Sequence, residues 1–168
     1  MSVSMATDLR RIVSLAASLL AAEGAMRSQT FATVPDPDPA VYRWLAAQPD
    51  GVVGEYPVGP LEGRAGPQDP TYMYYATRHW KPMLNGYSGF APPSYAALID
   101  ALGSFPDDRS VDYLRTRGVR YLLVHEPFYI EGDFAADVGQ LRARTDVRRV
   151  GRFRWRGGGS SEAFVLSE

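Results

Sequence analysis

The chain of 168 residues contains no cysteine and only two histidines, His79 and His125. The missing thiols exclude disulfide bridges, cysteine nucleophiles and zinc–thiolate sites. The two histidines do not form the HExxH or HxxxH patterns that are typical of histidine-built metal centres. We therefore expect neither a metal site nor a bound cofactor.

An excess of positive charge and the usual nucleotide-binding motifs are also missing. The chain has 18 lysines and arginines and 19 acidic residues, so no overall positive field attracts a nucleic-acid backbone. No GxGxxG motif follows a predicted strand, and neither GxxxxGK[ST] nor GxSxG occurs. The glycine-rich residues 157–161 lie between two predicted strands and indicate a hairpin loop. A nucleic-acid partner is therefore not expected.

No apolar run reaches the length of a typical membrane span. Residues 12–22 carry no charge and lie between Arg11 and Glu23, but a spanning helix needs about 20 mostly apolar residues. Three interpretations fit this segment: the end of a transmembrane helix, a short signal peptide, or an amphipathic helix. The composition alone favours the amphipathic helix.

The composition that is present suits one packed domain with an appendage. Apolar residues make up 45% of the chain and aromatic residues 12%, which is enough for a hydrophobic core. Pro35, Pro37 and Pro39 predict an extended linker, because proline fixes φ and disfavours helix before it. We therefore predict an N-terminal apolar helix, a possible membrane anchor, with its linker over residues 1–34, and an α/β domain over residues 35–168.

The pattern of apolar residues and turn signals predicts the elements of this domain. We expect helices over residues 40–47, 71–80, 94–105, 107–119 and 133–145, and strands over residues 52–58, 119–127, 147–156 and 162–167. The strand at 119–127 is almost entirely apolar, which is typical of a buried central position. The succession predicts a three-layer α/β fold with a small mixed sheet, flanking helices and a C-terminal β-hairpin.

Residues 74–95, YYATRHWKPMLNGYSGFAPPSY, combine aromatic rings with cations. Aromatic side chains of this kind stack on sugar rings or lie at a bilayer interface, and the cations can meet a phosphate. Asn85 and Gly86 predict a tight turn with positive φ. The alternative is a core segment whose hydroxyl groups are satisfied locally. The candidate ligand-binding residues of this stretch are Tyr75, Arg78, His79, Trp80, Lys81, Asn85 and Tyr87.

Glu55 and His125 complete the candidate site. Glu55 interrupts an apolar strand, so its carboxylate either faces solvent at the edge of the sheet or pairs with a cation such as Arg78 or Lys81. His125 lies at the end of the predicted central strand, where ligand crevices of α/β sheets occur. A structural histidine that bonds loop backbone is the alternative at this position.

Three stretches together resemble a known class of protein: VYRWLAAQPDGVVGEYPVG, YMYYATRHWKPMLNGYSGFAPPSY and FPDDRSVDYLRTRGVRYLLVH. Their order is similar to that in the C-terminal extracytoplasmic region of bacterial GT-C-type integral membrane glycosyltransferases, which are akin to the dolichyl-phosphate-mannose-protein mannosyltransferases. The resemblance covers roughly residues 9–167. It implies that residues 9–26 are a membrane anchor and that the α/β domain is extracytoplasmic.

The same resemblance implies a lipid-linked sugar or a membrane protein as partner. In that class, acidic residues in an upstream extracytoplasmic loop bind the polyprenyl-phosphate sugar, and this chain has no counterpart of that loop. We therefore expect an accessory domain that is not catalytic by itself. The alternative is a free-standing soluble α/β module that binds a small polar or sugar-like ligand.

Overall fold

A computed structural model of the chain describes residues 13–15, 18, 36–59, 68–86, 92–129 and 133–167. The chain divides into two units, Met1–Thr33 and Val34–Glu168. In the first unit residues 13–15 and 18 are helical and exposed, and the rest of the predicted anchor at residues 9–26 lies outside the described residues. Over the described ranges, no helix is both long and apolar enough to cross a bilayer.

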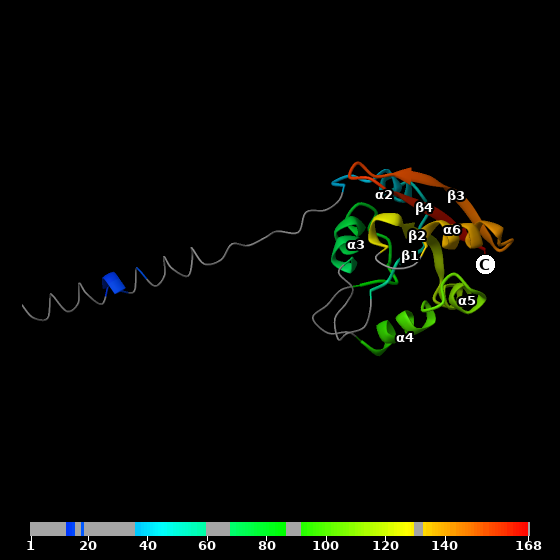
Figure 1. Cartoon of the computed structure of the whole chain (residues 1–168), viewed down its shortest axis with the longest axis horizontal. Helices are drawn as coiled ribbons and strands as arrows, with labels where there is room; N and C mark the ends of the chain where they lie inside the picture. Colours follow the sequence, from blue (N-terminus) through cyan, green and yellow to red (C-terminus); the bar gives the residue numbers. More distant parts are fainter. Residues whose placement is uncertain are drawn as a thin grey trace, which may run out of the picture. The chain divides into compact units, whose positions relative to one another are not determined.

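The second unit contains a four-stranded mixed sheet with the strand order β1-β2-β4-β3 (Figure 1). The strands are β1 (Val52–Tyr56), β2 (Val119–His125), β3 (Val147–Arg154) and β4 (Ser160–Leu166). Strands β1 and β2 are parallel, whereas β4 runs antiparallel to both β2 and β3. The predicted mixed sheet and its C-terminal hairpin are therefore confirmed.

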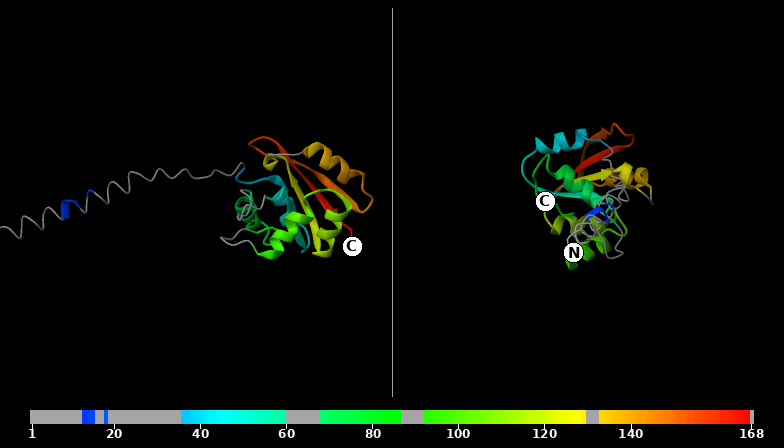
Figure 2. Two further views of the ribbon diagram at one scale, coloured as in Figure 1. Left: turned by 60° about the horizontal axis from the view of Figure 1, so that its bottom comes forward. Right: turned by 90° about the vertical axis from the view of Figure 1, so that its left-hand side faces the viewer.

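Helices flank the sheet, as the two views of Figure 2 show. They are α2 (Ala40–Ala46), α3 (Asp69–Ala76), α4 (Pro93–Ala101), α5 (Asp108–Thr116) and α6 (Phe134–Ala143), with a short 3-10 helix η1 (Glu126–Phe128) after β2. One hydrophobic cluster joins α4, α5 and α6 to the sheet, and the other joins α2 and α3 to it. Because side chains alternate along a strand, β2 supplies Leu122 to the first cluster and Leu123 to the second.

Strand β2 has the buried central position that its apolar sequence predicts. It lies between β1 and β4, and every residue except Arg120 is buried. Helices α5 and α6 also begin as predicted. The Asp107 carboxylate accepts a hydrogen bond from the Ser110 N–H, and the Asp133 carboxylate accepts bonds from the Ala135 and Ala136 N–H groups. These aspartates satisfy N–H groups that the first turn of a helix leaves unpaired.

Helix α3 is shorter than predicted, since it ends at Ala76 and not at residue 80. The chain continues through a turn to Trp80, which has a φ of 54°. The Trp80 N–H donates to the Ala76 carbonyl at 2.8 Å. A residue in the left-handed region that bonds back to the last turn is a common helix end, usually occupied by glycine. The helix therefore ends through backbone conformation before the chain reaches Pro82.

Residues 82–85 cover the outer edge of β1. The Val53 N–H donates to the Pro82 carbonyl, and the Leu84 N–H donates to the Val53 carbonyl, both at 2.8 Å. The Asn85 side chain accepts from the Glu55 N–H and donates to the Glu55 carbonyl, again at 2.8 Å in each case. Asn85 thus replaces a neighbouring strand at this point. The predicted tight turn is wrong, because neither Asn85 nor Gly86 has a positive φ.

The other edge of the sheet, β3, is rich in arginine. Arg149, Arg152 and Arg154 pair with Phe164, Glu162 and Ser160, which are alternate residues of β4. The register shift between Arg149 and Gly151 therefore places these three arginines on one face of the sheet. A charged, irregular outer strand hinders pairing with the edge of another sheet.

Candidate functional site

Glu55 and His125 meet at the carboxyl ends of the parallel strands β1 and β2, and both side chains are fully buried. One Glu55 carboxylate oxygen, Oε2, accepts a hydrogen bond from the Tyr42 hydroxyl at 2.5 Å and lies 2.9 Å from His125 Nε2. His125 Nδ1 lies 2.6 Å from Ser161 Oγ, which also accepts the Trp155 indole N–H at 2.6 Å. The five side chains form one continuous buried polar network.

The proton positions in this network follow from the chemistry of the groups. A carboxylate only accepts, so the Nε2–H of His125 donates to Glu55. In a neutral imidazole this leaves Nδ1 to accept the Ser161 hydroxyl, whereas in an imidazolium Nδ1 donates to Ser161 Oγ. Burial and the neighbouring Glu55 carboxylate raise the pKa of Tyr42 well above its ordinary value, which keeps its hydroxyl a donor. The other Glu55 oxygen, Oε1, is buried without a hydrogen-bond partner among the described residues.

Serine, histidine and glutamate are also the residue types of a hydrolytic triad. Here the arrangement cannot attack a substrate, because Ser161 is fully buried and its oxygen is already engaged by Trp155 and His125. The network instead links β1, β2 and β4 to α2 beneath the surface. We therefore assign Glu55 and His125 to the stability of the domain.

The sequence predicted other partners for these two residues. Arg78 and Lys81 do not pair with Glu55, since Arg78 donates to the Pro37 carbonyl at 2.9 Å and Lys81 Nζ donates to the Gln48 carbonyl at 2.7 Å. His125 bonds side chains and not loop backbone. Sequence reasoning missed Tyr42 and Ser161. The sequence predicted residues 157–161 as a hairpin loop, whereas the structure has Ser161 in β4.

Three further predicted site residues are buried in structural roles. The Tyr75 hydroxyl donates to the Asp36 carbonyl at 2.5 Å, and burial raises the pKa of Tyr75 to about 12. The Asn85 amide is occupied by the backbone of Glu55. The Lys81 side chain is almost fully buried against Gln48, and its ammonium group lies 3.7 Å from the Asp50 carboxylate.

His79 is buried beside these residues and does not offer a positive charge to a phosphate. Its Nδ1 accepts a hydrogen bond from the Lys81 backbone N–H at 3.0 Å. Its ring is parallel to that of Tyr42, with 6.1 Å between the ring centroids. Burial and the Lys81 charge lower the pKa of His79 to about 4. The imidazole is therefore neutral at pH 7.

Arg78 and Trp80 remain as predicted site residues that are exposed. Trp80 is 82% exposed, and two residues of α3, Met73 at 44% and Tyr74 at 43%, are exposed as well. Among the described residues of the α/β unit, these three are the exposed large hydrophobic side chains. We call Met73, Tyr74, Arg78 and Trp80 the α3 surface. Tyr87, the remaining predicted residue, lies outside the described residues.

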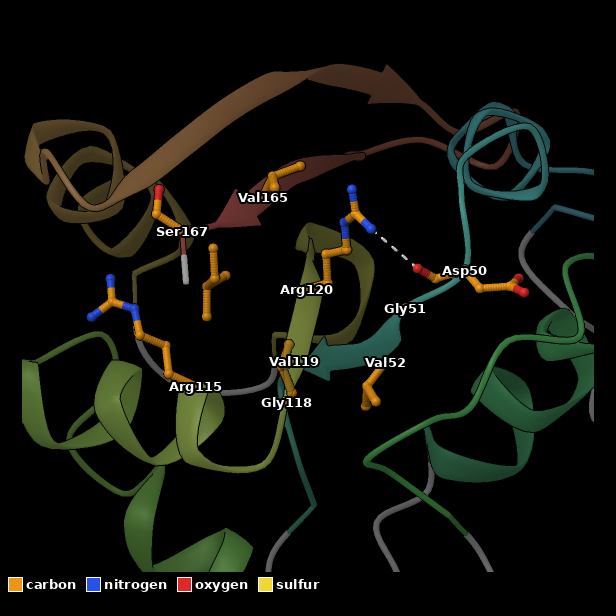
Figure 3. Close-up of a pocket in the computed structure, with 10 residues that line it drawn as sticks. Asp50, Gly51, Val52, Arg115, Gly118, Val119, Arg120, Val165 and Ser167 are labelled. Atoms are coloured by element: carbon orange, nitrogen blue, oxygen red, sulfur yellow. Dashed lines mark hydrogen bonds between the residues drawn. The ribbon is translucent and has the colours of Figure 1, made fainter.

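A cavity of about 630 Å³ lies at the other end of the strands (Figure 3). Val52 and Val119, at the amino ends of β1 and β2, line it together with Arg115 and Arg120. Two carboxylates bind the Arg115 guanidinium, Asp112 at 3.1 Å and Asp146 at 2.5 Å. The cavity contains none of the predicted ligand-binding residues.

Comparisons of the chain with protein-family models, with curated proteins and with solved structures give no match. In the part of the chain that the structure describes, no group of three or more histidine, aspartate or glutamate side chains is placed to hold a metal ion. Arg78 and Trp80, the exposed members of the predicted set, lie on the α3 surface, which makes this surface a candidate for contact with a ligand.

Proposed function

We propose that the chain is an accessory, extracytoplasmic domain of a membrane glycosyltransferase system and that its α3 surface binds a lipid-linked sugar. In this proposal residues 9–26 attach the chain to the membrane, and a separate membrane protein carries out the transfer. The observation that carries the proposal is Trp80, a large aromatic side chain that is 82% exposed in a backbone conformation with a φ of 54°.

The conformation of Trp80 supports a functional role for its indole. The left-handed region is unfavourable by about 1–2 kcal/mol for residues with a Cβ atom, and exposure of the ring leaves most of its apolar area in water. Helices commonly end in this conformation with glycine, and residues other than glycine that adopt it are uncommon and are concentrated at functional sites. The flat face of an indole is suited to the apolar face of a sugar ring.

Arg78 supplies the charge that a lipid-linked sugar requires. Its guanidinium has five N–H donors. One of its nitrogens donates to the Pro37 carbonyl at 2.9 Å. The nearest carboxylate contact is Asp38 at 3.7 Å, and the Arg78 side chain remains 43% exposed. Such a group can donate further hydrogen bonds to a phosphate.

Intrinsic tryptophan fluorescence tests the proposal. The full chain is titrated, without membranes, with methyl glycosides and sugar phosphates of several configurations. Trp155 is buried and Trp44 is partly buried, so a ligand on the α3 surface should change mainly the emission of Trp80. Isothermal titration calorimetry, which does not need Trp80 as a reporter, should show saturable binding that Trp80→Ala abolishes and Trp80→Phe weakens, whereas Arg117→Ala, an exposed change at the end of α5, leaves it intact.

An equal response of the parent chain and Trp80→Ala would place the ligand elsewhere and would refute the proposed surface. Cell fractionation then separates the two settings. Recovery of the chain with membranes supports the accessory domain of a membrane system. Sugar binding by a chain that fractionates with soluble proteins would favour the free-standing α/β module instead.

A further inference from the structure

The α3 surface is continuous with a group of arginines around residues 36–38, the segment through which the chain enters the α/β unit. Arg43 of α2 lies 2.6 Å from the Asp38 carboxylate, and Arg78 lies 3.7 Å from the other oxygen of the same carboxylate. The backbone N–H of Arg156, in the β3–β4 hairpin, donates to the Asp36 carboxylate at 3.0 Å. Arg43, Arg78 and Arg156 thus lie beside one short segment, although Arg78 and Arg156 come from distant parts of the chain.

The two acidic residues of this segment, Asp36 and Asp38, do not cancel the charge of the three arginines. Asp36 is buried, and its carboxylate is occupied by the N–H groups of Asp38 and Arg156. Asp38 is shared by Arg43 and Arg78. Among the described residues, no carboxylate forms an ion pair with Arg156, which is exposed. Three arginines against two aspartates leave the surface around residues 36–38 with one net positive charge.

The aromatic side chains adjoin this charge. The Tyr74 ring packs edge-on against the Tyr75 ring, with 5.3 Å between the ring centroids. The Tyr75 hydroxyl donates to the Asp36 carbonyl at 2.5 Å. Trp80 follows Arg78 by two residues and is exposed with Met73 on the same short helix and turn. Tryptophan, tyrosine and arginine at one surface are typical of proteins that lie at the interface between water and a bilayer.

We propose that this surface lies against an anionic phospholipid bilayer, with Trp80 and Tyr74 at the level of the lipid headgroups and with Arg43, Arg78 and Arg156 near the lipid phosphates. The positive charge complements the negative surface of such a bilayer. The length of chain between this surface and the anchor also allows both to lie at one bilayer. This step rests on the anchor proposed above, residues 9–26. Nine residues lie between residue 26 and residue 36, and a fully extended chain from one to the other spans at most about 35 Å.

This contact goes beyond the proposed function, because it assigns a membrane role to the α/β unit itself. It is tested with the full chain and with vesicles that contain no glycolipid, composed of phosphatidylcholine with or without phosphatidylglycerol. Lipids brominated in the acyl chains quench only tryptophans that lie close to the bilayer. We expect quenching of the parent chain on the anionic vesicles and its loss in Trp80→Phe, because Trp155 is buried and Trp44 is partly buried.

A charge variant provides the second measurement. Arg78→Gln combined with Arg156→Gln should weaken vesicle binding by about 25-fold, since one arginine near an anionic surface contributes about fivefold. The matched control is Arg109→Gln on α5, an exposed arginine that forms an ion pair with the exposed Asp100, which should leave binding unchanged. Melting curves of each variant confirm that it is folded.

Two outcomes would overturn the membrane contact. One is a chain that sediments with vesicles while Trp80→Phe is quenched as strongly as the parent, since residues outside the surface would then make the contact. The other is an equal loss of binding in the double variant and in Arg109→Gln. Neither outcome affects the sugar titration, which uses no membranes, and failure of that titration leaves the vesicle result intact.

Discussion

Replacing Trp80 tests the conformation on which both proposals depend. Trp80 lies in the left-handed region at the end of α3, where glycine is the usual residue. Trp80→Gly should therefore give a more stable protein than Trp80→Ala. This order is the reverse of the one found inside helices and strands, where alanine is favoured over glycine.

The magnitude follows from three contributions. An alanine at residue 80 retains a left-handed penalty of about 1–2 kcal/mol, which glycine avoids. A glycine at residue 80 lowers the free energy of unfolding by about 0.5–1 kcal/mol, because it has greater freedom in the unfolded chain. Trp80→Gly should therefore be more stable than Trp80→Ala by about 0.5–1 kcal/mol. Loss of the indole itself should cost only about 1 kcal/mol, because less than a fifth of Trp80 is buried. A fully buried tryptophan would cost about 3–5 kcal/mol.

Urea or thermal unfolding followed by circular dichroism measures these differences, and about 1 kcal/mol corresponds to a shift of about 3–5 °C in a domain of this size. The matched control is Thr77, which is exposed and has right-handed φ and ψ of −62° and −12°. There Thr77→Ala should be more stable than Thr77→Gly by about 0.5–1 kcal/mol. The two positions should thus show opposite orders.

A result in which alanine is favoured at both positions would show that Trp80 does not adopt the left-handed conformation. A loss above about 3 kcal/mol for both Trp80 variants would show that the ring is packed in the interior. Either result would remove the exposed indole from the proposed sugar surface and from the proposed membrane contact.

Four further predictions concern the interior and use the same unfolding assay. Glu55→Ala should cost about 3–5 kcal/mol, because it removes one partner of a buried pair; a loss below about 1 kcal/mol would contradict the network. Asn85→Ala leaves a backbone N–H and a carbonyl of β1 unpaired and should cost about 2–4 kcal/mol, whereas an unchanged midpoint would refute its edge role. Leu123→Asp, in the centre of β2, should abolish folding or cost several kcal/mol. The folded pKa of His79, about 4, lies below the unfolded value of about 6.5. Stability should therefore fall as the pH decreases from about 6.5 to 4, and His79→Asn should flatten that slope if His79 is its source.

Local signals in the sequence determined the elements of the fold. The apolar run of β2, the aspartates that begin α5 and α6, and the glycines of the β3–β4 hairpin each act within a few residues. Such signals depend on backbone geometry and on the period of the side chains, so they are visible without tertiary contacts. The mixed α/β class followed from their order.

Only the tertiary structure decided which polar residues lie on the surface. Tyr74 and Tyr75 are neighbours in the sequence, yet Tyr75 is buried against Asp36 and Tyr74 is exposed. Glu55 and His125 meet because β1 and β2 pair in parallel with a particular register, which no local pattern specifies. The sequence shows which chemical groups are present within residues 74–95, but long-range packing determines which of them a ligand or a bilayer can reach, because burial depends on residues far away in the chain.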